Sequence, residues 1–332
     1  MKIGYLGSGV WAYTLATLLA AKGYQVTMWS IDEEVIAHLQ EKREHPRLPG
    51  HTAPTSLSFT TNMKEVLTGK DLIVEGVTSA GVRQVFQKIK EIHVPKCPIV
   101  LTSKGIEQNT GLLLSEVAVE VLGKEHKKQI GCISGPSLAP EVLKGLPASV
   151  VCSGYSPEVM KKIHSAFSTP TFRVYPNPDI NGVELGGAMK NIIAIACGAA
   201  DGLGFGDNTK AALMTRGLHE IRRLAATRGC KAETLNGLAG MGDLCVTCLS
   251  TLSRNYRFGR LIAEGKSPDE AKKEIGMVVE GSYTCLSAIQ LAKKANIELP
   301  IAEAVYKVVY ESMNPKEAVK LLLQRITKEE YL

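Results

Sequence analysis

Lys190 is the residue of this sequence whose surroundings best suit chemistry on a bound substrate. It stands in the middle of Asn181–Asp201, a long run of apolar and small residues with the spacing of a buried helix. At helical spacing the neighbouring side chains are short, which leaves room beside the ammonium group. The functional alternative is a cationic group held at a bound substrate. The stretch alone leaves open that Lys190 is an ordinary charge reaching the surface.

Two glycines, Gly186 and Gly187, lie in the same run although glycine disfavours helix. We expect them because either another backbone segment or a bound ligand approaches the helix closely there. Asp243 ends the glycine-rich segment Gly237–Asp243, which we expect to be a turn.

The triplet Ser253, Arg254 and Asn255 would begin a helix, with Ser or Asn as its cap. Free amides at a helix N-terminus beside a guanidinium group form a good phosphate site. An ordinary capped helix on the surface would have the same sequence, so these residues alone do not decide between the two.

The N-terminus predicts a dinucleotide site. A short apolar strand, Lys2–Leu6, runs into the motif GSGVWA and then into a helix. In this context Gly7 permits a tight turn, and Gly9 lets a pyrophosphate approach the backbone and the helix N-terminus. A glycine turn without a ligand is the alternative, and the second strand at Tyr24–Trp29 argues against it. The residues after that strand include Asp32 but no Arg, so NADH and NADPH both remain possible.

Other polar residues follow later strands. Lys104 comes directly after the predicted strand Pro98–Ser103, and Gly135 and Ser137 follow the predicted strand Gln129–Ser134. Open parallel sheets bind ligands at the carboxyl ends of their strands, so these residues are candidates for a site. A solvated loop is the alternative for Lys104.

The alternation of strands and helices predicts an α/β fold in which a Rossmann-like, doubly wound sheet is followed by an all-helical domain. We place the dinucleotide-binding domain at residues 1–178 and the substrate-binding and catalytic domain at residues 179–332, with no strand after the turn at Pro176–Asp179. The Pro-rich, polar stretch His45–Pro54 predicts a surface loop.

Composition excludes several classes of function. The chain has 332 residues, 45% hydrophobic and 22% charged, with a net charge of +6 spread along it, which does not indicate nucleic-acid binding. The pair Cys245 and Cys248 lacks the second pair or the histidines of a zinc site, so we expect no metal. We find no signal peptide and no apolar run long enough to span a bilayer, and the cysteines are scattered as free thiols are in a reducing compartment. We therefore expect a cytoplasmic protein without integral membrane contact.

Several segments in order then resemble the bacterial type of NAD(P)-dependent glycerol-3-phosphate dehydrogenase. They are GSGVWA, LTSKGIE, SGPSLAPE, ELGGAMKNIIAIACG, GLAGMGDLCVTC, SRNYRFG and VVEG. The resemblance extends from about residue 2 to about residue 325. It implies reversible reduction of dihydroxyacetone phosphate to sn-glycerol 3-phosphate with NADH or NADPH, a role in glycerophospholipid synthesis, and a homodimer.

The resemblance also implies roles for individual residues. Lys190 matches the proton donor and acceptor, and Lys104 a lysine that touches both substrate and cofactor; Asp243 is our third catalytic candidate. The substrate-binding positions are Lys104, Gly135, Ser137, Lys190, Asp243, Ser253, Arg254 and Asn255. The cofactor-binding positions are Gly7, Gly9, Val10, Trp11, Lys104, Ala139, Arg254, Val278 and Glu280. The chain departs from the family at Val10, at Tyr13 and at Ile31, where Arg is frequent, and the last departure questions a preference for NADPH.

Two other functions remain open at this point. One is a related dehydrogenase of hydroxy acids or hydroxyacyl-CoA esters with the same layout. The other is a dinucleotide sensor without catalytic activity. The presence of Lys190, Asp243 and Arg254 argues against the sensor, which would bind cofactor but turn over no substrate.

Overall fold

The first half of the chain folds into one eight-stranded sheet with the order β3-β2-β1-β4-β5-β6-β7-β8. The computed structural model describes residues 1–326 and 329–330. Neighbouring strands are parallel except β6 and β7, which are antiparallel. The strands are β1 (Lys2–Leu6), β2 (Gln25–Trp29), β3 (Leu57–Thr60), β4 (Leu72–Glu75), β5 (Ile99–Leu101), β6 (Ile130–Ser134), β7 (Ala148–Gly154) and β8 (Phe172–Pro176). The winding direction reverses at β1, between β2 and β4, and α/β sheets bind ligands at such a point.

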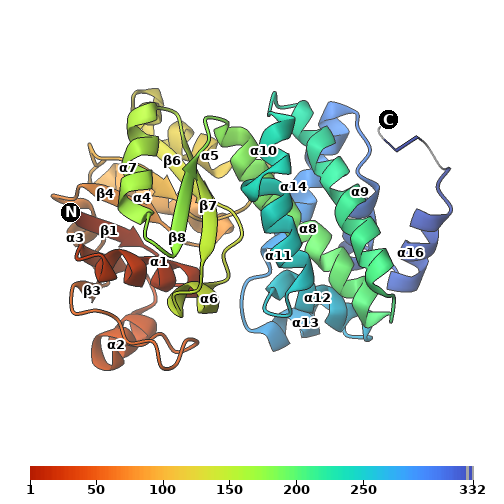
Figure 1. The fold of residues 1–332 in the computed structure, drawn as a ribbon, viewed down its shortest axis with the longest axis horizontal. Coiled ribbons are helices and arrows are strands. Elements are labelled where there is room, and N and C mark those ends of the chain that lie inside the picture. Colours follow the sequence, from red (N-terminus) through yellow and green to blue (C-terminus); the bar gives the residue numbers. More distant parts are fainter. Residues whose placement is uncertain (327–328, 331–332) are drawn as a thin grey trace.

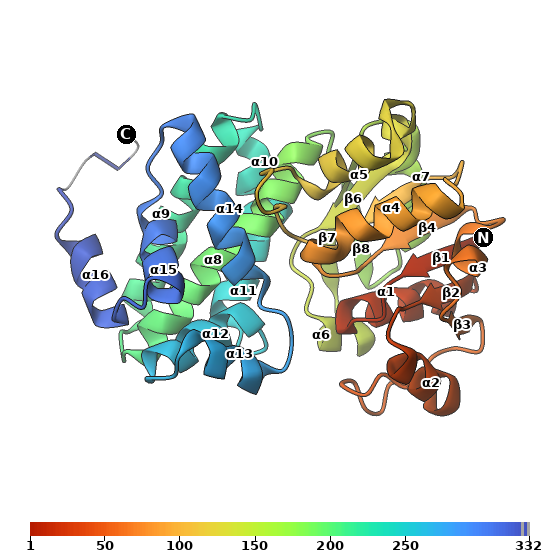
Figure 2. The same ribbon diagram turned by 180° about the vertical axis from the view of Figure 1, so that it is seen from behind.

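Helices cover both faces of this sheet, as the two opposite views show (Figures 1 and 2). One face packs against α1 (Val10–Ala21), α2 (Glu33–Lys42), α6 (Ala139–Leu143) and α7 (Pro157–Phe167). The other packs against α3 (Met63–Leu67), α4 (Val82–Ile92) and α5 (Leu114–Leu122), with short 3-10 turns η1 (Ser79–Gly81) and η2 (Lys124–Gln129). Because helices cover both faces, every residue of a strand such as β4 is buried, whichever face its side chain points to. The predicted doubly wound fold is confirmed.

The second half is helical, and the structure shows no strand after Pro176 in the residues it describes. The helices are α8 (Ile180–Gly202), α9 (Asp207–Ala226), α10 (Ala232–Asn236), α11 (Asp243–Leu249), α12 (Arg254–Ala263), α13 (Pro268–Ile275), α14 (Glu280–Ala295), α15 (Pro300–Tyr310) and α16 (Pro315–Leu323), with a π-helical turn η3 (Leu238–Gly242) before α11. They surround α8, which lies at the centre of the helical part in both views.

The central helix α8 is the one described segment that is long and apolar enough to cross a bilayer by length and composition. We expected no such segment. However, 89% of its most apolar 18-residue window is buried inside the protein. Its apolar composition therefore reflects packing on all sides by other helices.

Three other expectations need correction. Gly237–Asp243 is not an open turn, because η3 continues directly into α11 and Asp243 begins that helix. The stretch His45–Pro54 has no regular structure, but His45 and Leu48 within it are buried rather than at the surface. The segments that form α2, β3, α3, α5, α6, α7 and α11 were not predicted as helices or strands.

Candidate active site

The N-terminus of α1 is open to an anion. Gly7 has φ of +106°, and a Cβ there would lie 2.5 Å from the carbonyl oxygen of Gly76, so only glycine fits this turn. Gly9 occupies the N-cap position of α1, and no side chain there accepts a hydrogen bond from the first amides of the helix. A Cβ built on Gly9 would meet nothing within 4 Å. No acidic residue lies in the first turn. Uncapped amides facing open space suit the pyrophosphate of a dinucleotide.

The other predicted cofactor residues come from several elements. Val10 and Trp11 are half-buried in the first turn of α1, and Ala139 begins α6, which packs against α1. From the helical half, the Glu280 carboxylate accepts hydrogen bonds from the backbone N–H and the hydroxyl of Ser79. This contact joins α14 to the segment that follows β4.

His45 is a residue near this turn that the sequence did not single out. Its Nε2 lies 3.0 Å from the carbonyl oxygen of Ser8, inside the glycine-rich turn. Burial lowers the pKa of the imidazole, which favours its neutral form. The buried side chain thus ties the loop after α2 to the cofactor turn.

Lys190 and Lys104 share one carboxylate. Lys190 Nζ donates to Asp243 Oδ1, and Lys104 Nζ donates to Asp243 Oδ2 at 2.6 Å. Lys190 comes from α8, Asp243 from α11 and Lys104 from the segment after β5. Lys190 and Asp243 are 7% and 1% exposed, so Lys190 is not a surface charge. The structure brings together the three residues that the sequence proposed for catalysis.

Thr247 completes this group and was missed. Lys190 Nζ donates to Thr247 Oγ1 at 2.9 Å, and the Thr247 hydroxyl donates to the backbone carbonyl of Asp243 at 2.6 Å. On a helix, residues four apart share a face. The spacing of Asp243 and Thr247 would have indicated the contact if this segment had been predicted as helix instead of turn.

Burial lowers the pKa of Lys190 to about 8, and the positive charge of Lys104 acts in the same direction, whereas Asp243 opposes the shift. A lysine with this pKa can both give and take a proton near neutral pH.

The adjacent glycines Gly186 and Gly187 of α8 face protein atoms. A Cβ on Gly186 would lie 2.7 Å from the carbonyl oxygen of Ala239, and one on Gly187 would lie 2.5 Å from Ser134 Oγ. Of the two alternatives expected there, another backbone or a ligand, the structure shows close approach by the protein itself. Glycine lets η3 and the end of β6 pack against α8, which places Asp243 beside Lys190.

Gly135 presents its carbonyl oxygen to the lysine group. This oxygen accepts from Lys104 Nζ at 3.1 Å and from Ser137 Oγ at 3.0 Å. Gly135 has φ of +135°, and a Cβ there would come within 2.9 Å of Val150 Cα. The turn after β6 therefore requires glycine and lies beside Lys104.

The predicted phosphate residues form the start of α12. Ser253 caps this helix by accepting from the N–H of Tyr256, as the sequence suggested. Arg254 is half-buried and donates from Nη1 to the carbonyl oxygen of Val278. The Asn255 side chain is turned inward, where it donates to Asn191 and accepts from Gly281 N–H. The groups at this end that can face a ligand are thus the Arg254 guanidinium and the backbone amides.

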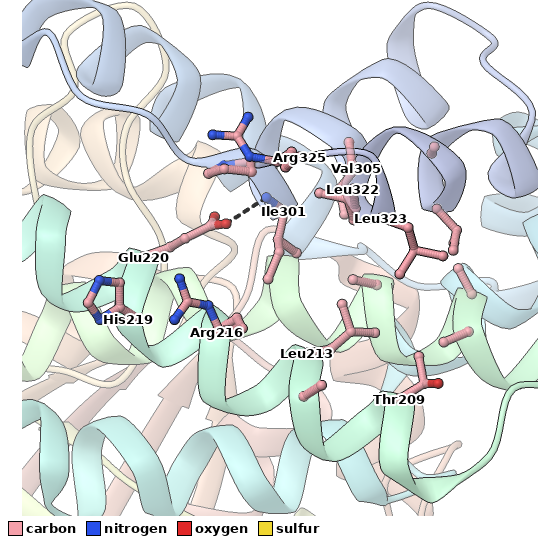
Figure 3. Close-up of a pocket in the computed structure, with 18 of the residues that line it drawn as sticks. Thr209, Leu213, Arg216, His219, Glu220, Ile301, Val305, Leu322, Leu323 and Arg325 are labelled. Atoms are coloured by element: carbon pink, nitrogen blue, oxygen red, sulfur yellow. Dashed lines mark hydrogen bonds between the residues drawn. The ribbon is translucent and has the colours of Figure 1, made fainter. Parts of the chain in front are cut away.

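A cavity of about 590 Å³ lies elsewhere, between α8, α9, α15 and α16 (Figure 3). Its lining is mostly apolar, and Glu220 within it accepts hydrogen bonds from the N–H groups of Ile301 and Ala302 at the start of α15. None of the proposed catalytic or cofactor residues lines it, so it is separate from the lysine group.

The chain is similar along its whole length to one family of known proteins. Residues 2–160 match the N-terminal part, and residues 179–320 the C-terminal part, of the NAD-dependent glycerol-3-phosphate dehydrogenase family. The chain belongs to this family. A relative from Protochlamydia amoebophila, named glycerol-3-phosphate dehydrogenase [NAD(P)+], is 59% identical over 100% of this chain and 99% of its own length. One of the same name from Chlamydia felis is 58% identical with the same coverage.

Solved structures of the family share the fold. The crystal structure of glycerol-3-phosphate dehydrogenase from Coxiella burnetii has a TM-score of 0.93 and 39% identity, covering 98% of this chain and 99% of that one. D-mandelate dehydrogenase, at 14% identity and a TM-score of 0.63, shares the fold alone. As a member of the glycerol-3-phosphate dehydrogenase family, the chain is an NAD(P)-dependent oxidoreductase with a Rossmann-like fold.

Proposed function

We propose that the protein catalyses the reversible reduction of dihydroxyacetone phosphate by NADH or NADPH to sn-glycerol 3-phosphate. The observation that carries this proposal is the group of Lys190, Asp243 and Lys104, which meet where the carboxyl edge of the sheet faces the helical half. Its two cations suit a carbonyl oxygen that becomes negative during reduction.

Lys190 would act as the proton donor in reduction and as the acceptor in oxidation. In reduction, its ammonium group would stabilise the developing alkoxide at C2 and then transfer a proton to it. Asp243 would orient Lys190 through the buried ion pair, while Thr247 accepts a second hydrogen bond from Nζ. Lys104 would supply the second positive charge near the same oxygen.

The substrate phosphate would bind at the start of α12. The Arg254 guanidinium and the first backbone amides of the helix, including that of Asn255, are the donors available there. Ser253 would keep that end of the helix in place as its cap. Gly135 and Ser137, at the turn beside Lys104, would contact the rest of the substrate.

The cofactor would lie along the carboxyl edge of the sheet. The open N-terminus of α1, with Gly7, Gly9, Val10 and Trp11, would hold the pyrophosphate. Further contacts would come from Lys104, Ala139, Arg254, Val278 and Glu280. When bound, the nicotinamide supplies or accepts the hydride at the substrate carbon.

We further propose two domains with a boundary between residues 178 and 179, just before α8; residues 327–328 and 331–332 of the second lie outside the described residues. A cytoplasmic homodimer that supplies glycerol 3-phosphate for phospholipid synthesis fits the family. The reaction that consumes this product would be an acyl transfer to its free hydroxyl groups.

Initial rates with dihydroxyacetone phosphate test the function, with NADH and NADPH as the two cofactors. We expect cofactor oxidation that depends on the phosphorylated ketone and is far slower with dihydroxyacetone. A panel of 2-oxo acids and 3-oxoacyl thioesters covers the alternative dehydrogenases. Turnover of one of these instead, or cofactor binding without any turnover, would refute the proposal.

A further inference from the structure

Glu75 is a carboxylic acid in the middle of the sheet, and the proposed mechanism does not use it. It is the last residue of β4, with Leu6 of β1 on one side and Leu101 of β5 on the other. Its side chain is 0% exposed. A buried carboxyl group is costly unless hydrogen bonds compensate, so its contacts indicate what it does.

The contacts of Glu75 join the ends of two strands. Oε1 accepts from the backbone N–H of Val77 at 2.7 Å and from Ser103 Oγ at 2.7 Å. Val77 belongs to the segment after β4, and Ser103 to the segment after β5. Oε2 is buried and has no hydrogen-bond partner. Ser103 Oγ also lies 2.5 Å from the carbonyl oxygen of Val77, so the two strand exits are joined both directly and through Oε1 of Glu75.

Both exits lead directly to contacts with the helical half. Ser103 precedes Lys104, whose Nζ reaches Gly135 and Asp243. Two residues after Val77, Ser79 donates to Glu280 of α14. Glu75 therefore binds the two segments that carry these contacts, at the carboxyl edge of the sheet that faces the helical half.

We propose that Glu75 is a positioning residue, which holds the segments after β4 and β5 together so that Lys104 meets the Lys190–Asp243 pair. This inference rests on the proposed function, because it assigns Lys104 a role in the same reaction. Glu75 acts through Ser103 and does not touch the substrate.

The charge state of Glu75 gives a second readout. Burial raises its pKa to about 7, although the hydrogen bond from Ser103 opposes the shift. The titratable group facing it from β1 is Tyr5, whose pKa burial raises far above neutral, so Tyr5 stays uncharged. Lys104 turns its Nζ away, toward Gly135 and Asp243. Since an ionised carboxylate is the stronger acceptor, the two exits are held more tightly as pH rises through about 7.

The experiment combines Glu75→Met, which removes both acceptors at similar volume, with Glu75→Gln, which keeps an acceptor but cannot ionise. We expect Glu75→Met to lower kcat at least tenfold while changing the Kd for NADH less than about twofold. Glu75→Gln should restore most of kcat at pH 8 and lack the rise in kcat through pH 7. Ser103→Ala should resemble Glu75→Met, and the double variant should be no worse than either alone.

Glu220→Gln is the matched control. Glu220 is also buried with a pKa raised to about 7 by burial, but it binds the start of α15, away from the site. It should leave kcat and its pH profile unchanged. A wild-type kcat in Glu75→Met, or additive losses with Ser103→Ala, would overturn the proposal. If Glu75→Met does not fold, Glu75→Gln tests the proposal by itself. A pH profile of kcat in Glu75→Gln identical to that of the wild type would refute it. Absence of any turnover by the wild type would instead refute the function.

Discussion

Lys190 and Asp243 form a buried ion pair between the central helix α8 and the helix α11, which packs against it. The pair depends on close packing, since Gly186 lets η3 approach α8 directly before Asp243. The second carboxylate oxygen of Asp243 binds Lys104, so Asp243 also connects the helical half to the sheet. This arrangement leads to predictions about turnover, pH and binding.

Lys190→Met should fold and bind NADH but lose about 10²–10⁴-fold in kcat with dihydroxyacetone phosphate, because it removes the proton donor. Stopped-flow or steady-state rates and a separate binding titration measure the two effects. Lys210→Met serves as the control, because Lys210 is an ion-paired lysine of the same half, bound to Asp201 and Asp207. A kcat near that of the wild type would exclude Lys190 as the donor.

The pH dependence should have opposite signs in the two directions. Reduction needs the protonated form of Lys190, so its rate should fall as pH rises above about 8, where the buried ammonium loses its proton. Oxidation of glycerol 3-phosphate needs the neutral amine, so its rate should rise through the same range. Rate profiles in both directions at saturating cofactor test this above pH 8, where Glu75 is already ionised, and profiles that move together in that range would contradict it.

Asp243→Asn should move this transition to lower pH. The negative charge of Asp243 raises the pKa of Lys190, whereas Lys104 lowers it. Without the carboxylate, only burial and the second lysine act, so the pKa of Lys190 falls further below its ordinary value. The reduction rate should therefore decline at a lower pH than in the wild type. A transition at the same or higher pH would show that the pair does not set the pKa of Lys190.

The sequence predicted the parts of this site that local patterns specify. The turn at Gly7 and Gly9 lies within one strand–helix unit, and Lys190 stands in a long periodic run, so both could be recognised without knowing the fold. The cap at Ser253 was likewise a local signal. These predictions concern residues close together in the chain.

What the sequence could not predict depends on packing between distant segments. Gly237–Asp243 looks like a turn because glycine is a poor helix former, yet burial against α8 makes it helical. Gly186 and Gly187 were expected to face either another backbone or a ligand, and only the structure shows that their neighbours come from η3 and β6. The inward turn of Asn255 toward Asn191, 64 residues away, also follows only from the assembled helices.

Arg254→Ala should raise KM for dihydroxyacetone phosphate roughly 10- to 100-fold with a smaller effect on kcat, because it removes a charge-assisted contact to the phosphate. Arg257→Ala is the matched control, since Arg257 is exposed on the same helix. Its KM should equal that of the wild type. An unchanged KM in Arg254→Ala would place the phosphate away from the start of α12.

The end of β2 should favour NADH over NADPH. Ile31 is 73% exposed there, and α2 begins with Glu33 and Glu34 after its cap, Asp32. The Asp32 carboxylate accepts a hydrogen bond from the N–H of Val35, so this backbone amide of α2 is not free to bind a 2′-phosphate. The start of α1, by contrast, has no side-chain cap. Three acids at this point would repel that phosphate, while Asp32 could accept from a ribose hydroxyl.

We therefore expect the Kd for NADPH to exceed that for NADH by about tenfold at low salt, with a smaller ratio as salt screens the exposed charges. Quenching of the two tryptophans, Trp11 and Trp29, can measure both constants without turnover. The double substitution Ile31→Arg and Glu33→Gln should reduce the ratio mainly by tightening NADPH. Glu41→Gln, the same charge change as Glu33→Gln but near the other end of α2, should leave the ratio unchanged. Equal or tighter binding of NADPH by the wild type would show that a cation elsewhere in the protein receives the 2′-phosphate.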